Sequence, residues 1–145
     1  MELMGSGESP EGAEFEVLSE AECRRLLDTE TLGRVAFVFD GRPQIFPVNY
    51  AFDDGVVVFR TSAGLKLERG PYTYAAFEVD HVDRATGVAW SVVVQGTAHD
   101  ITDTIDTRSE RLRQVLVKPV APGDRSDWMG IYADRITGRR FKLPA

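Results

Sequence analysis

The chain has 145 residues, close to the commonest size of a single domain, and 43% of them are hydrophobic. Five acidic and no basic residues fall within the first sixteen positions, so the rest is close to neutral despite a net charge of −6. This distribution excludes a basic nucleic-acid-binding protein. The sequence has neither a signal peptide nor an apolar run approaching the roughly 18 residues that cross a membrane, so we expect a cytoplasmic protein with no membrane partner.

The first part of the chain divides into a tail and the start of a domain. Residues 1–14 are predicted to form a disordered acidic tail because they are rich in glycine, serine and glutamate. Residues 15–145 are predicted to form one domain, whose ordered part begins with Phe15–Leu18.

A capping box follows Leu18. Ser19 and Glu22 have the spacing of the motif, which predicts a short helix ending at about Asp28. Cys23, the one cysteine, lies on the inner face of this helix and is expected to be a core residue rather than a nucleophile. A single cysteine also excludes an intrachain disulfide and a cysteine-cluster metal site.

From Gly33 the apolar pattern changes to a period of two, which is typical of strands. Two turn sequences, Asp40-Gly41 and Asp53-Asp54-Gly55, separate three such runs. The pattern predicts a meander of three antiparallel strands, the third of which is Val56–Phe59. Pro47 interrupts the middle strand. Because proline has no N–H to donate, that strand is expected at an edge, at a bulge, or facing something other than a neighbouring strand there.

The residues after Pro47 are Val48, Asn49 and Tyr50. Their hydrogen-bonding groups are then available at a sheet margin, where a flat polar heterocycle could bind. An ordinary edge strand protected by a proline is an equally good interpretation.

Polar residues follow the third strand at once, in the order Arg60, Thr61, Ser62 and, after Gly64, Lys66. Two cations, two hydroxyl groups and a glycine in a turn before a helical turn are suited to a phosphate. The spacing matches neither the P-loop nor the dinucleotide-binding glycine motif. Two solvated charges beside a turn are the alternative interpretation of Arg60 and Lys66.

The second half of the chain continues the β pattern. Strands are predicted over Tyr72–Val82 and over Gly87–Ile101, with a bend or bulge at Gly96. A helix is predicted from Thr102 or Asp103 to about Lys118. After a loop and the apolar run Trp128–Tyr132, the segment Asp134–Leu143 is predicted to contain a strand and a turn at Thr137-Gly138. Together these elements predict a mainly β fold, an antiparallel barrel of about six strands with two or three short helices.

No catalytic residue is identified from the sequence. His81 and His99 each adjoin an aspartate, and pairing at the surface is favoured over a shared metal because the spacing of known metal motifs is missing. No motif for an activated nucleophile is present. Difficult chemistry would therefore have to come from a bound cofactor.

Four segments between about Leu18 and Phe141 together resemble the FMN-binding split-barrel superfamily, in particular the pyridoxamine 5′-phosphate oxidase-like proteins. LSEAECRRLLDTETLGRVAF resembles the entry helix and first strand, and PQIFPVNYAFDDGVVVFRTSAGLKLERG resembles the flavin-contacting hairpin and phosphate turn. GVAWSVVVQGTAHDI resembles the long later strand, and DRITGRRF resembles the C-terminal segment.

The resemblance implies a split barrel over residues 15–145 that forms a homodimer and binds FMN at the subunit interface. Carried over by position, it implies phosphate binding by Arg60, Thr61, Ser62 and Lys66, and ring contact by the backbone of Pro47, Val48, Asn49 and Tyr50. It further implies that Trp90 and Ser91 reach the cofactor and that Arg139 and Arg140 approach it from the partner subunit. The turn from Thr61 to Lys66 is one residue shorter than in the oxidases themselves, and it resembles the flavin reductase-like branch.

The leading hypothesis is an FMN-dependent oxidoreductase that passes electrons or a hydride between the flavin and a small planar substrate. Relatives that the resemblance brings in use a deazaflavin coenzyme or bind haem. A non-catalytic protein that stores or senses flavin or haem is the main alternative. A barrel without a cofactor, which uses its edge strands only to dimerise, is a third.

Overall fold

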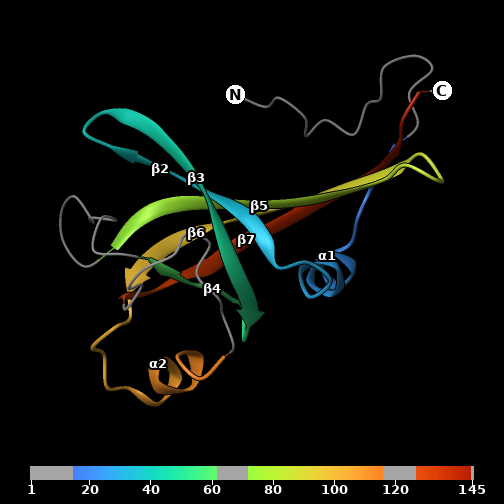
Figure 1. The fold of residues 1–145 in the computed structure, drawn as a ribbon. Coiled ribbons are helices and arrows are strands. Elements are labelled where there is room, and N and C mark those ends of the chain that lie inside the picture. Colours follow the sequence, from blue (N-terminus) through green and yellow to red (C-terminus); the bar gives the residue numbers. More distant parts are fainter. Residues whose placement is uncertain (1–14, 62–71, 116–126, 145) are drawn as a thin grey trace.

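The computed structural model describes residues 15–61, 72–115 and 127–144. Within them the chain forms seven antiparallel strands and two short helices (Figure 1). The elements are β1 (Phe15–Val17), α1 (Glu20–Leu27), β2 (Leu32–Phe39), β3 (Arg42–Asp53), β4 (Val56–Thr61), β5 (Tyr72–Asp83), β6 (Val88–Asp100), α2 (Thr107–Leu112) and β7 (Asp127–Lys142). No helix of the described part is long and apolar enough to cross a membrane.

Six of the strands close into a ring. Hydrogen bonds connect them in the order β7-β4-β3-β2-β5-β6, and β6 pairs with β7 again. The short β1 pairs with β7 at Arg139–Phe141, beyond the part of β7 that pairs with β4. The predicted six-stranded antiparallel barrel is therefore confirmed.

The inner face of the ring holds the main core. Alternate residues of each strand point inward, and the largest of them, such as Phe59, Phe77 and Ile131, are fully buried. Helix α1 closes one side of this core with Cys23, Leu26 and Leu27, while the side chain of Ser19 caps its first turn. The capping box predicted this helix correctly, and Cys23 is a core residue as expected.

A smaller core lies on the outer face under α2. Val56 and Val58 of β4 pack there against Ile101 and Leu112. The prediction that a helix begins at Thr102 or Asp103 is wrong, because Asp106 caps α2 through a 2.9 Å hydrogen bond from the backbone of Ser109. Thr102 is instead tied to β7 by a hydrogen bond from the backbone N–H of Trp128. The predicted helical end near Lys118 lies outside the described residues.

Strand β7 runs without interruption for 16 residues, so the predicted turn at Thr137-Gly138 is wrong. Both residues pair with β6 in register. Gly138 serves the packing of α1 instead, because a Cβ atom there would lie 2.7 Å from the sulfur of Cys23.

The predicted irregularity at Gly96 is confirmed. The register between β6 and β7 shifts between Gln95 and Gly96, which leaves Asp134 as the extra residue of a β-bulge. A Cβ atom at Gly96 would lie 1.9 Å from the carbonyl oxygen of Tyr132, so only glycine allows the two strands to approach this closely.

The ring opens where neighbouring strands part. β3 pairs with β4 only from Tyr50 to Asp53, whereas its pairing with β2 covers Arg42–Asn49. Among the described residues, this first part of β3 therefore has one paired edge and one open edge. Pro47 lies within it, as its missing N–H predicted, and Figure 1 shows the β2–β3 hairpin reaching away from β5, β6 and β7.

Gly96→Ala is expected to lower the free energy of unfolding by about 2–3 kcal/mol, because the added methyl group meets backbone rather than a movable side chain. Urea unfolding measures this loss. Gly130→Ala is the matched control: its Cβ would lie 3.0 Å from a side-chain carbon of Val56, which can move, so the loss is expected to be about 1 kcal/mol or less. Equal losses in the two variants would contradict the explanation.

Candidate functional site

Arg60 lies at the end of β4, where the strand pairs with the start of β7. Its guanidinium carbon is 5.1 Å from the centre of the Trp128 ring, which stacks against it. The Nε atom of Arg60 is buried, and it has no hydrogen-bond partner within the described part of the chain. Burying such a group without a partner is costly, so this position is suited to an incoming acceptor.

Thr61 follows Arg60 at the same rim and is half-buried opposite Asp127. Ser62 and Lys66, the other two predicted phosphate ligands, lie outside the described residues. The structure therefore places two of the four predicted residues, side by side on one strand.

Arg60 is also next to the predicted ring-binding strand. The β3–β4 ladder ends at Tyr50 and Phe59, so Asn49 and Arg60 are the first residues beyond it on the two parting strands. Asn49 is half-buried and pairs with Leu32 of β2. The open edge of β3 and the guanidinium thus lie on either side of the same split.

Three of the predicted residues point into the core. Val48, Tyr50 and Trp90 are each less than 9% exposed. The hydroxyl of Tyr50 donates a 2.6 Å hydrogen bond to the carbonyl of Leu27, and burial raises the pKa of this phenol. Their side chains support the barrel, and only their backbone groups are left to meet a ligand.

Other predicted residues share the outer face of the sheet. Pro47 pairs with Arg34, and Arg34 pairs with Glu78. Two residues further along β5, Asp80 pairs with Ser91 of β6, and Ser91 pairs with Arg139 of β7. These two rows place Pro47, Ser91 and Arg139 on one face with three charged residues that the sequence did not single out.

Those three residues, Arg34, Glu78 and Asp80, form an ion-pair cluster. Arg34 Nη2 lies 2.7 Å from Glu78 Oε1 and 2.8 Å from Asp80 Oδ2. Burial, followed by a hydrogen bond with Asp80, raises the pKa of Glu78 to about 7, while that hydrogen bond lowers the pKa of Asp80. Because these residues are more than 40 positions apart from Arg34 in the sequence, only the strand pairing reveals the cluster.

The two late arginines are engaged within the chain. The guanidinium of Arg139 lies 5.3 Å from the centre of the Phe15 ring. Arg140 donates to Glu16 and to Glu22, both at 2.9 Å, and so ties β7 to β1 and α1. Their approach to a cofactor in a partner subunit stays a prediction.

The two histidines contact residues other than Arg60. His81 Nδ1 is 3.9 Å from a carboxylate oxygen of Glu30. His99 stacks on Tyr72, contacts the edge of Tyr132, and has its pKa lowered by burial. Within the described ranges no group of three metal-ligating side chains exists.

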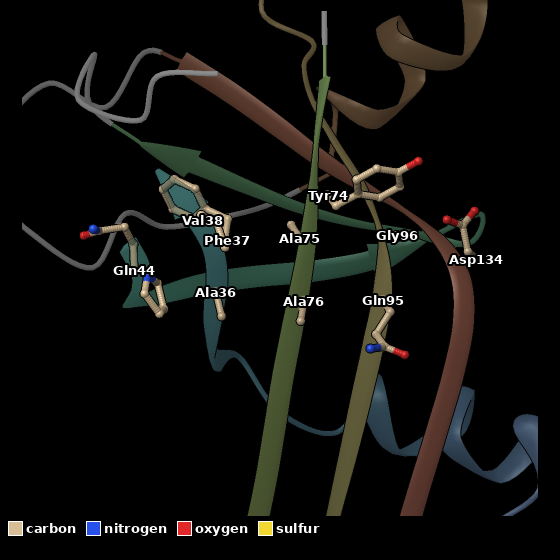
Figure 2. A pocket seen from close by; sticks show the side chains of 11 residues that line it. Ala36, Phe37, Val38, Gln44, Tyr74, Ala75, Ala76, Gln95, Gly96 and Asp134 are labelled. Carbon is tan, nitrogen blue, oxygen red and sulfur yellow. The ribbon is translucent and has the colours of Figure 1, made fainter. Parts of the chain in front are cut away.

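One groove lies apart from the Arg60 rim. It has a volume of about 400 Å³ and lies where β2 and β5 part, with Tyr74, Gln95 and Asp134 around its mouth (Figure 2). A second groove of about 180 Å³ adjoins it across Ala36 and Ala76. Both belong to the outer side of the barrel.

The fold agrees with a comparison against known proteins. The family model described as pyridoxamine 5′-phosphate oxidase matches residues 19–140. The chain belongs to the pyridoxamine 5′-phosphate oxidase-like family. Its split barrel is the fold of that family's solved members, so the expected fold class is confirmed.

Three solved members of similar structure show the extent of the match. A FAD-binding protein from Mycobacterium smegmatis is 31% identical, with a TM-score of 0.71, over 88% of this chain and 98% of its own. A proposed pyridoxamine 5′-phosphate oxidase from Corynebacterium glutamicum is 31% identical, with a TM-score of 0.75, over 90% of this chain and 96% of its own. A FAD-binding protein from Mesorhizobium loti is 25% identical, with a TM-score of 0.71, over 90% of this chain and 99% of its own.

Arg140→Gln is expected to raise the pKa of Glu22, which hydrogen bonds from Arg25 and Arg140 hold at about 2. The lowered pKa stabilises the fold above about pH 4.5, and this contribution is lost as the pH falls toward 2. The difference in unfolding midpoint between wild type and variant should therefore shrink between pH 6 and pH 3. Carboxyl NMR titration measures the pKa directly; an unchanged value would show that Arg25 alone sets it.

Proposed function

We propose that the protein is a flavin-dependent oxidoreductase that holds the phosphate of its cofactor at the end of β4 and the flavin ring along the open edge of β3. The observation that carries this proposal is the buried Nε of Arg60, which has no hydrogen-bond partner among the described residues. A guanidinium offers a planar pair of donors that matches a phosphate, and Trp128 holds it in place from one side. Thr61 follows on the opposite face of the strand and would contribute through its backbone, and Ser62 with Lys66 would complete the set.

The open edge of β3 is suited to the ring. Pro47 leaves the strand exposed there, and Asn49 lies beside the split from which Arg60 projects. Backbone and amide donors at this edge would stabilise negative charge on a reduced ring, which is the usual contribution of a protein beside a flavin. The flavin supplies the redox chemistry, and the chain positions it.

The identity of the flavin has two candidates. The resemblance implies FMN, whereas relatives from M. smegmatis and M. loti are described as FAD-binding proteins. Both nucleotides carry the phosphate that Arg60 is proposed to bind, so the proposed site serves either. We favour FMN, and mass spectrometry of the chromophore released on denaturation separates it from FAD, a deazaflavin and haem.

We further propose that the protein acts in the cytoplasm as a homodimer with the cofactor at the subunit interface. A non-catalytic flavin- or haem-binding protein is the second candidate. It is favoured if the purified protein carries a chromophore that NAD(P)H does not reduce. Reduction by NAD(P)H followed by reoxidation with a nitroaromatic compound or a quinone favours the enzyme.

Arg60→Ala and Lys66→Ala are each expected to weaken flavin binding at least about tenfold while the protein stays folded, because each removes one charged contact with phosphate. Titration of the flavin-free protein, followed by flavin fluorescence, gives the dissociation constants. Arg84→Ala, which removes an exposed cation from the β5–β6 turn, is the matched control and should bind as wild type. Stoichiometric flavin in both test variants would show that the site is misassigned.

A further inference from the structure

The second groove ends at the ion-pair cluster on the outer face of the barrel. It lies between β2, β3 and β5 and has a volume of about 180 Å³. Its lining residues are Arg34, Ala36, Ile45, Ala76, Phe77 and Glu78. The apolar residues form its floor and side, and the two charged residues stand together at one end.

Two small residues form the middle of the floor. Ala36 and Ala76 pair directly across β2 and β5, and both continue into the larger groove of Figure 2. Ile45 of β3 borders the floor and is 70% exposed. An apolar floor of this shape, with a few polar groups at one end, is suited to a flat organic molecule.

The polar end offers hydrogen-bond donors. Arg34 donates to the carboxyl groups of Glu78 and Asp80. Because the pKa of Glu78 is raised to about 7, Glu78 carries a proton below that pH. On β6, Val93 pairs with Glu78 and carries no charge, and on β3, Pro47 lies beyond Arg34. The next charged groups are His81, beside Asp80, and Arg139, which Ser91 separates from Asp80.

The groove is also continuous with the proposed flavin strand. Pro47 and Ile45 lie on the same face of β3, and Pro47 is the direct pairing partner of Arg34. Strands in a sheet are about 4.8 Å apart, so Glu78 lies only about 10 Å from Pro47 across β2. A molecule in the groove would therefore lie beside a ring held along β3.

We propose that this groove is the substrate end of the proposed flavin site, and that Glu78 and Arg34 bind the oxygen of a flat organic substrate there. The inference rests on the proposed function. Glu78 donates its one proton to Asp80 in the free protein and would turn it to the substrate oxygen on binding. Asp80 is a positioning residue that holds this proton beforehand and shares Arg34 with Glu78.

The test measures binding rather than turnover. The probe is 2,3-dimethyl-1,4-naphthoquinone, and 2,3-dimethylnaphthalene is the matched probe without oxygen. Calorimetry gives both dissociation constants in flavin-loaded and flavin-free protein. The quinone should bind at least about threefold more tightly than the hydrocarbon at pH 6, because it alone accepts a hydrogen bond.

The pH dependence separates Glu78 from a merely apolar groove. Affinity for the quinone should fall about three- to tenfold as the pH rises through about 7, because Glu78 loses the proton that it donates. Glu78→Gln keeps an amide donor and should bind equally at pH 6 and pH 8.5. Asp80→Asn removes the charge that raises the pKa of Glu78 and should move the midpoint to lower pH. Glu110→Gln, on the exposed side of α2, should leave the profile unchanged.

Methyl NMR locates the probe, since Ala36, Ile45 and Ala76 should shift on its addition. Unshifted methyl groups, equal binding of the two probes, or a pH profile that survives Glu78→Gln would each overturn the proposal. A groove covered by a second copy would show as unshifted methyl groups in the dimer, which also overturns it, whereas a dimer with shifted methyl groups is the result expected of the proposed homodimer. Failure of the flavin titration with a normal quinone profile would instead overturn the proposed function alone.

Discussion

The parting of β3 from β4 beyond Tyr50 and Phe59 is the constraint on which the site depends. A closed barrel pairs the edges of its strands, so backbone groups become available only where two neighbours separate. Within the described residues, the separation frees the edge of β3 around Pro47 and leaves Arg60 paired on one side alone, to Trp128 of β7. The same break in the ring therefore exposes the strand and places a cation beside it.

The two faces of the sheet have different roles: the inner face stabilises the barrel, and the outer face carries residues proposed to bind a ligand. Inward residues such as Val48, Tyr50 and Trp90 are buried in the main core, and they fix the path of the strands that carry the site. Outward residues of the same strands, among them Pro47, Asn49 and Ser91, stay partly or fully exposed. Because side chains alternate along a strand, a run of predicted site residues cannot all reach one ligand through their side chains.

Local signals in the sequence predicted local structure well. Ser19 with Glu22 predicted α1, the Asp-Gly turns predicted the β2–β3 and β3–β4 hairpins, and Pro47 predicted an open strand edge. The start of α2 was missed because the hydroxyl of Thr102 is used by β7, a contact between residues 26 positions apart. The cluster around Arg34 was missed for the same reason, since register across the barrel, rather than any motif, brings Glu78 and Asp80 to it.

The environments of the arginines explain why Arg60 is the phosphate candidate within the described residues. Arg34, Arg108 and Arg140 each face carboxylates at 3.2 Å or less, so a phosphate would have to displace an existing ion pair. Arg139 stacks on Phe15 but has no orphaned atom. Arg60 combines an aromatic support with a buried donor that nothing in the described chain satisfies. An anion that binds there removes a desolvation cost the protein already bears, whereas elsewhere it would create one.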